Sequence, residues 1–93
     1  MPAQQTRQEL NAVGAANPIP IQNSPLKSFQ VSGVFSGTVV IEISNNGVDW
    51  LPASTESAPV LRNILEDAAF ARARCSAYTS GTIVVVWAQS TGA

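Results

Sequence analysis

The chain contains no histidine, and this absence removes much of the usual chemistry of enzyme sites. Histidine is the usual general base near neutral pH and the commonest metal ligand in proteins. Without it, serine and cysteine lose the usual base that activates them as nucleophiles, and the only lysine, Lys27, lies at the start of a predicted strand. Glu66 and Asp67 are adjacent in sequence, so on a strand they would face opposite sides and could not share a metal ion. We therefore expect no enzyme, no catalytic residue, no metal site and no cofactor.

Cysteine and charge are also scarce. Cys75 is the only cysteine, so no disulfide can form within the chain, and its place in an alternating segment predicts a small buried residue. Charged residues make up 12% of the 93 residues, about half the usual share. With a net charge of −1 and no basic cluster, the chain is not expected to bind nucleic acid. A surface so poor in charge is typical of one that contacts other proteins.

Long apolar runs are missing as well. No segment approaches the roughly 18 apolar residues needed to span a membrane, and the N-terminus lacks the apolar core of a signal peptide. We expect a soluble protein with no membrane partner, and its length predicts one small domain.

A β-hairpin is the clearest local signal. Apolar and other residues alternate over Thr38–Ile43, an Asn-Asn-Gly turn follows at 45–47, and the chain returns with Trp50. Gly47 can adopt the positive φ that a tight hairpin turn requires. The pattern predicts that Trp50 folds back into the core, together with one face of the first strand, Val39, Ile41 and Ile43.

Short strand patterns continue along the rest of the chain. They cover residues 29–34, 38–44, 48–53, 60–65, 69–78 and 82–87, with 60–65 alternatively irregular or helical. The first three are expected to form a meander that turns at Ser36-Gly37 and at 45–47. Turns that recur about every ten residues predict an all-β fold, namely a small antiparallel β-sandwich of about six to seven strands, immunoglobulin-like or jelly-roll-like. A small barrel is the alternative. We assign the domain to residues 26–93.

Residues 1–25 have a different composition, rich in Gln, Asn, Ala and Pro. They are expected to form an extended N-terminal arm that is not part of the sandwich, because the segment has few apolar residues to bury. Ile19 and Ile21, which alternate with prolines, are candidate contacts for a neighbouring protein. A capping-box pattern, Thr6 followed by Glu9, indicates one or two helical turns over 6–13 as an alternative. We expect deletion of the arm to leave a folded sandwich.

The segment 69–78 alternates between small and large side chains, which predicts that the small face points inward. The large face carries Arg72 and Arg74, framed by Phe70 and Tyr78. Guanidinium groups beside aromatic rings could bind a protein, a carboxylate or a sugar, and we favour a protein contact for Arg72, Arg74 and Tyr78. The alternative is a solvated edge or an ion pair with an acidic residue of the chain, Glu42, Glu66 or Asp67.

The segment 82–87 is nearly continuous in β-branched residues. Ile83, Val85 and Trp87 can fill the core, which leaves Val84 and Val86 on the opposite face of the strand. They are candidate contacts as an exposed apolar stripe. The alternative is that the arm or the second sheet covers them.

Three ordered motifs suggest a family. They are Phe29-x-Val31-x-Gly33-x-Phe35-x-Gly37-Thr38-Val39, then Ile41-x-Ile43-Ser44-Asn-x-Gly47-x-x-Trp50, then Phe70-x-Arg72-Ala-Arg74-Cys-x-Ala-Tyr78-Thr-Ser-Gly81-Thr-Ile-Val-Val. In this order they resemble a pattern of small β-sandwich structural proteins of tailed bacteriophages. The resemblance covers about two-thirds of the chain and matches poorly over 62–67.

This resemblance implies a virion protein, made in the host cytoplasm. The expected role is that of a capsid decoration or cement protein, which binds the major capsid protein or other virion proteins as a homo-oligomer, with a trimer as the first expectation. A tail or baseplate accessory subunit is one alternative. A module that binds a glycan or host surface through Arg72, Arg74, Tyr78 and the Asn45-Asn46 tip is another.

Overall fold

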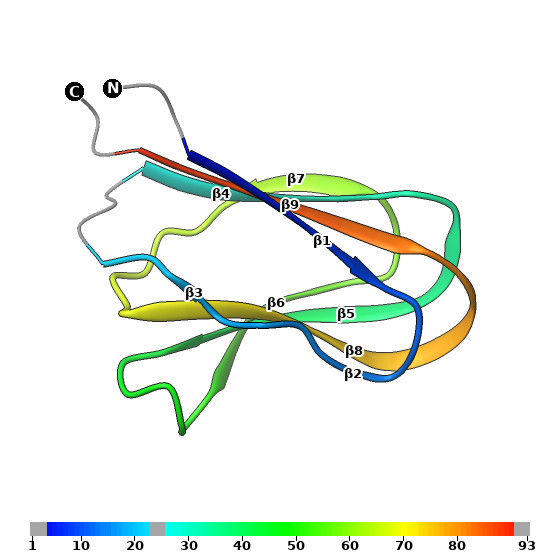
Figure 1. Ribbon diagram of the computed structural model, residues 1–93, viewed down its shortest axis with the longest axis horizontal. Helices are drawn as coiled ribbons and strands as arrows, with labels where there is room; N and C mark the ends of the chain where they lie inside the picture. Colours follow the sequence, from blue (N-terminus) through cyan, green and yellow to red (C-terminus); the bar gives the residue numbers. More distant parts are fainter. Residues whose placement is uncertain (1–3, 23–25, 91–93) are drawn as a thin grey trace.

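A computed structural model describes residues 4–22 and 26–90, which fold into two antiparallel sheets packed face to face (Figure 1). The expected all-β antiparallel sandwich is confirmed. No helix that could cross a membrane occurs among these residues. The strands are β1 (Gln4–Leu10), β2 (Gly14–Ala15), β3 (Ile19–Pro20), β4 (Leu26–Ser32), β5 (Phe35–Ser44), β6 (Leu51–Glu56), β7 (Val60–Asn63), β8 (Phe70–Gly81) and β9 (Ile83–Ser90).

The first sheet has the order β1-β9-β4-β7, and the second has the order β2-β8-β5-β6, with β3 also paired to β8. After β4 the chain moves between the sheets at every connection except the β5–β6 hairpin. The expected meander is therefore wrong at its first turn, because β4 and β5 belong to different sheets. The chain changes sheet at Gly33, whose φ is 98° and where a Cβ atom would lie 2.5 Å from the carbonyl oxygen of Thr82. Ser36 and Gly37 lie inside β5, where the register with β8 shifts.

The β5–β6 hairpin forms at the expected turn, but its loop is longer than expected. Gly47 has a φ of 75°. The Ser44 Oγ accepts hydrogen bonds from the backbone N–H groups of Asn46 and Gly47, and the Asn46 Oδ1 accepts two more, from Val48 and Asp49. Side chains therefore satisfy the loop backbone, and β6 begins only at Leu51.

The core lies between the two sheets and follows the expected alternation. The inward residues of β9 and the small inward residues of β8 have at most 2% of their surface exposed; they are Ile83, Val85, Trp87, Ala71, Ala73 and Cys75. The rings of Phe29 and Trp87 lie 6.1 Å apart between centroids, at an angle of 54°. Small residues on β8 face large ones on β4 and β9, which allows the layers to pack closely.

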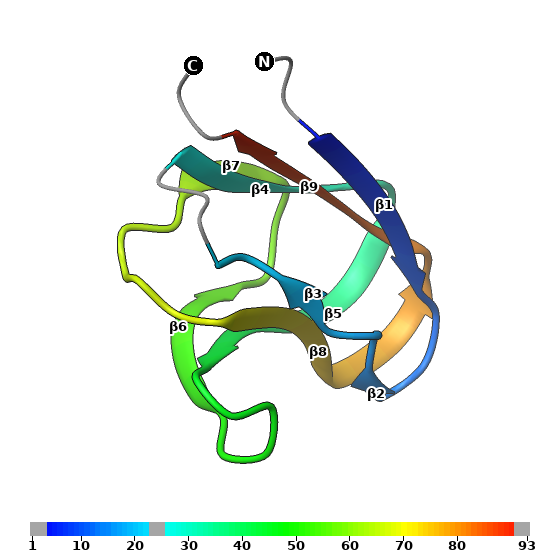
Figure 2. The ribbon, with the colours of Figure 1, turned by 60° about the vertical axis from the view of Figure 1, so that its left-hand side comes forward.

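Residues 4–22 are extended, as expected, but they contribute strands to both sheets instead of lying outside the sandwich. The strand β1 pairs with β9 along its whole length, and β2 and β3 pair with β8 (Figure 2). Leu10, Ile19 and Ile21 are buried in the core. The helical alternative over 6–13 is wrong, because residues up to Leu10 pair with β9 and 11–13 connect to β2. The expected domain boundary falls beside residues 23–25, outside the described residues.

Polar contacts join the sheets at both sides of the sandwich. On one side, the Nε of Arg62 in β7 donates a hydrogen bond of 2.7 Å to Glu56 in β6. Burial alone would raise the pKa of Glu56, but hydrogen bonds from Arg62 and Ser54 and the charge of Arg62 lower it below its ordinary value. On the other side, the Nε2 of Gln8 in β1 donates a hydrogen bond of 2.9 Å to the carbonyl oxygen of Asn17, between β2 and β3. The Oε1 of the same Gln8 accepts a hydrogen bond of 2.9 Å from the indole Nε1 of Trp87, within the first sheet.

Candidate protein-contact surfaces

The outer face of the second sheet carries a compact ionic cluster, here called the charged face: Glu42, Trp50, Arg72 and Arg74. Arg72 and Arg74 point outward from β8, and Glu42 lies opposite Arg72 on β5. The carboxylate of Glu42 accepts hydrogen bonds from the Nε of Arg72, at 2.8 Å, and from the Nε of Arg74, at 3.1 Å. Of the alternatives for these arginines, the pairing with Glu42 is therefore the one that the structure contains.

Trp50 belongs to the charged face and not to the core. The guanidinium carbon of Arg72 lies 4.4 Å from the centroid of its ring, a distance at which a cation is attracted to the ring's π electrons. The expectation that Trp50 fills the core is wrong, because the hairpin loop delivers it to the outer side of the sheet, while Trp87 fills the core. Arg72 is thus held between a carboxylate and an aromatic ring.

The charges of this cluster largely satisfy one another. Burial by itself would raise the pKa of the Glu42 carboxyl, but hydrogen bonds from Arg72 and Arg74 and their positive charges outweigh burial and lower it. Glu42 is therefore ionised at neutral pH and shared by two cations. The side chains of Arg72 and Arg74 remain 24% and 39% exposed.

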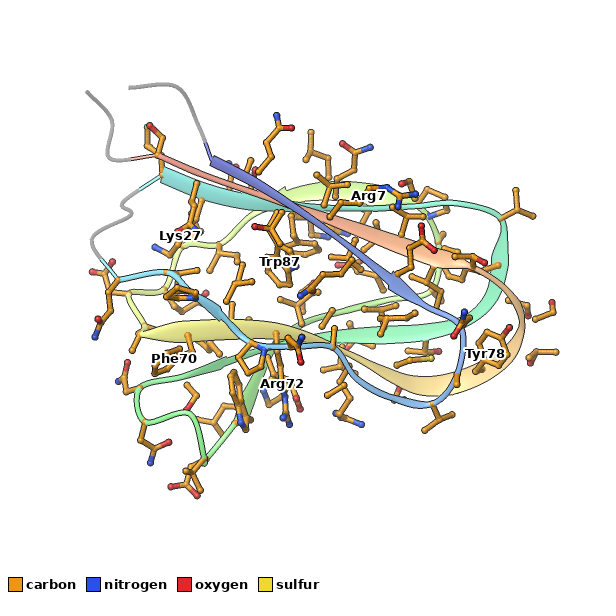
Figure 3. All side chains as sticks on the ribbon, in the orientation of Figure 1. Arg7, Lys27, Phe70, Arg72, Tyr78 and Trp87 are labelled. Carbon is orange, nitrogen blue, oxygen red and sulfur yellow. The ribbon has the colours of Figure 1, made fainter. Side chains whose placement is uncertain are left out.

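Tyr78 lies apart from the two arginines. Val39 pairs with Cys75 and Thr38 with Ala77, so Ser76 is an extra residue in β8 that inverts the alternation. The ring of Tyr78 packs against the core, and its hydroxyl donates a hydrogen bond to the carbonyl oxygen of Gly81. Figure 3 shows Tyr78 at the opposite end of the sandwich from Phe70, with Arg72 on the outer side of the second sheet. The expectation that Tyr78 frames Arg72 and Arg74 is therefore wrong.

The outer face of the first sheet has the opposite chemistry. Across β9, β4 and β7 it carries only apolar and uncharged polar residues, and we call it the uncharged face: Ser28, Gln30, Ser32, Leu61, Asn63, Val84, Val86 and Ala88. Val84 and Val86 are half-buried by their neighbours within the sheet, and Leu61 is 67% exposed. The strand β1 lies beside β9 in the same sheet, so in the described part of the chain no second layer covers Val84 and Val86.

Two charged residues at the edge of this sheet were not among the expected site residues. Arg7 and Glu9 lie on the outer side of β1, next to Val86 and Val84, and form an ion pair with each other. Residues two apart lie on the same face of a strand. If residues 4–10 had been predicted as a strand, the sequence would therefore have indicated this ion pair.

Ile19 and Ile21, the other candidate contacts, are buried at 7% and 2% exposure. They fill the sandwich's own core because β3 aligns the segment with β8. Their side chains therefore offer no surface to a neighbouring protein.

A shallow hollow of about 270 Å³ lies beside the uncharged face at the end of the first sheet. It includes one charged residue, Lys27, and its lining is Leu26, Lys27, Ser28, Asn63, Ile64, Leu65, Ala88, Gln89 and Ser90. Among the described residues, no three His, Cys, Asp or Glu side chains lie close enough to hold a metal ion. Comparisons of the chain with protein-family models, with curated proteins and with solved structures find no significant match. The function is therefore inferred from the chain's own surfaces and sequence pattern.

Proposed function

We propose that this chain is a virion structural protein, and specifically a capsid decoration protein that attaches to the shell through the uncharged face. The observation that carries the proposal is that one outer sheet face combines half-buried and exposed apolar side chains with uncharged polar ones. The resemblance of residues 29–87 to small phage structural proteins supports the same role.

The uncharged face is suited to a protein partner on physical grounds. Each apolar side chain that leaves water gains about 25 cal/mol per Å² of buried apolar surface, and Val84, Val86 and Leu61 lie partly or largely exposed there. Gln30 and Asn63 can hydrogen-bond to a partner without the large desolvation cost of an ion. Binding across joints between shell subunits would stabilise the closed shell by mass action, because the joints exist only when the shell is closed.

The proposed partner is the major capsid protein or another virion protein. It would be contacted by a symmetric homo-oligomer, with a trimer as the first expectation. A tail or baseplate accessory subunit would use the same face at another place in the particle. A glycan-binding module is less well supported. Its candidate surface is the charged face, where Glu42 already engages both arginines and Arg72 occupies one side of the Trp50 ring.

The test is incorporation into the virus particle that encodes the chain. The wild-type protein should co-purify with intact particles at a fixed ratio and be visible on the shell by electron cryo-microscopy. Val86→Lys places a charge in the uncharged face and should reduce incorporation by about tenfold or more. The matched control, Leu51→Lys, changes an exposed apolar residue on the other sheet and should incorporate normally. Absence of the wild-type protein from particles would reject the proposal.

A further inference from the structure

The four outer edges of the two sheets differ in how well they could accept another strand. An exposed edge offers unpaired backbone groups, and proteins usually block it with short strands, prolines or bulges. The strand β6 carries Pro52 and a register shift, β7 has four residues, and β2 and β3 have two residues each. In contrast, β1 has seven residues, contains no proline or glycine, and pairs with β9 without any shift. The strand β1 therefore has none of these three blocks. Charged side chains also protect edges, but the two on β1, Arg7 and Glu9, have opposite signs and form an ion pair.

The free side of β1 is accessible in the described structure. The strand has β9 on one side, and the sheet order places no strand on its other side. Gln5, Thr6, Arg7 and Glu9 are exposed. Backbone N–H and C=O groups therefore point along this edge toward solvent, as in any edge strand.

We infer that β1 pairs antiparallel with β1 of a second copy of this chain, with Gln8 opposite Gln8. In this register, Arg7 of each copy lies directly opposite Glu9 of the other, on the outer side of the sheet. Opposite charges at such cross-strand positions stabilise a pair of strands, and like charges destabilise it. The ion pair already present between Arg7 and Glu9 within each strand becomes part of an alternating group of four charges.

Other registers are disfavoured by the same residues. A slip of two residues in one direction places Arg7 opposite Arg7, and a slip of two in the other direction places Glu9 opposite Glu9. A slip of one residue would turn the core side of one sandwich toward the outer side of the other. Charge thus selects one two-fold register, in which both copies use the same residues.

The product is one sheet of eight strands with the order β7-β4-β9-β1-β1-β9-β4-β7, which sets two uncharged faces side by side. Edge pairing of two short strands buries less surface than the roughly 800 Å² per partner of a stable dimer. The dimer should therefore form as concentration rises and dissociate on dilution. The inference concerns two copies of the purified chain and does not depend on attachment to a shell.

The experiment is sedimentation velocity of the full chain over a wide range of concentrations. The wild-type protein should pass from monomer to dimer, and backbone amides of residues 5–9 should gain protection from hydrogen exchange as the dimer forms. Arg7→Glu should weaken self-association by about tenfold or more, because acidic residues then face each other. Glu9→Arg should do the same with basic residues. Gln30→Glu, on the same side of the sheet but away from the edge, should dimerise as the wild type does.

The decisive experiments restore the pattern of opposite charges across the two β1 strands. The double variant Arg7→Glu/Glu9→Arg should dimerise again, and a mixture of the two single variants should form a mixed dimer although each alone is monomeric. Circular dichroism identifies any variant that fails to fold, and the remaining variants then carry the comparison. A wild type that stays monomeric, a single variant that dimerises as well as the wild type, or a double variant that stays monomeric overturns the inference.

Discussion

On the outer face of the second sheet, two arginines share one carboxylate beside a tryptophan ring, whereas the outer face of the first sheet has no charge on β9, β4 or β7. Both faces are outer faces of antiparallel sheets in the same small sandwich. They differ in where their side chains find partners. The charged face satisfies its polar groups within the chain. In the part of the chain that the structure describes, the apolar groups of the uncharged face have neighbours along their own sheet and no covering layer.

This difference indicates which face is open to a neighbour. A partner of the charged face would have to compete with hydrogen bonds and a cation–π contact that already exist. No strand among residues 4–22 and 26–90 lies over the uncharged face, so a partner would displace water from it, and the release of water from apolar surface is favourable. An abundance of charged side chains is therefore a poor guide to the contact surface of this protein.

The largest expected effect comes from removing the segment that supports both faces. Deletion of residues 1–22 removes β1 from the first sheet and β2 and β3 from the second, together with Leu10, Ile19 and Ile21 of the core. Truncating one such buried side chain typically costs about 2–5 kcal/mol, and a small domain has only about 5–15 kcal/mol in total. We now expect the shortened chain to be unfolded, contrary to the sequence-based expectation, as measured by near-ultraviolet circular dichroism.

A point variant tests the same segment more gently. Ile21→Ala should lower the free energy of unfolding by about 3 kcal/mol, whereas Val34→Ala, at a residue that is 91% exposed, should change it by less than about 0.5 kcal/mol. A deletion variant that keeps the wild-type spectrum and cooperative unfolding would show that both sheets stand without residues 1–22.

The second effect separates the two faces directly. Glu42→Ala leaves Arg72 and Arg74 close together without their shared carboxylate, and should lower the free energy of unfolding in urea by about 2 kcal/mol. This is below the usual cost of breaking a buried ion pair, because both guanidinium groups reach solvent. Glu9→Ala, which breaks the ion pair at the edge of the other sheet, should cost no more than about 0.5 kcal/mol. If both variants lost the same unfolding free energy, the ionic contacts of the charged face would stabilise the fold no more than the exposed pair on β1.

The smallest effect is the pH dependence of the charged face. The pKa of Glu42 is lowered in the folded protein, so its ionised form stabilises the fold above the unfolded pKa of about 4.3. This contribution is lost as the pH falls through the lowered pKa. The stability difference between the wild type and Glu42→Gln should therefore be largest above about pH 5 and shrink in acid. The pKa of Glu56 is also lowered, but Glu56 is present in both proteins, so its contribution cancels in the stability difference. A difference that stays constant down to pH 2 contradicts this account.

The sequence predicted the strands whose side chains form a clear pattern. Alternation between small apolar and large polar residues identified the inward side of β8, and a β-branched run identified β9. In contrast, β1 buries only one large apolar residue, Leu10, so its polar sequence carries no periodic signal. An edge strand that is held mainly by backbone hydrogen bonds can have the same polar amino-acid composition as a disordered arm, so composition alone does not distinguish the two.

The contact surfaces were predicted less well, for two local reasons. One extra residue, Ser76, reverses the side on which Tyr78 lies, and no feature of the sequence marks a bulge of this kind. The hairpin loop is longer than the Asn-Gly pattern suggested, and it places Trp50 beside Arg72 instead of in the core. Alternation in the sequence correctly placed Val84 and Val86 on the outer side of β9. The sequence did not show whether residues 4–10 would lie over these valines or, as observed, beside them in the same sheet.

The pairing of β1 with β9 brings together residues 4–10 and 83–90. During synthesis, the first of these segments emerges long before its partner exists, so the first sheet cannot close until nearly the whole described chain has left the ribosome. Contacts between residues so distant in sequence form slowly, because a long loop must close before they contribute. Until then, neither side of residues 4–10 has a strand to pair with. The polar side chains of this segment then help to keep the nascent protein from aggregating.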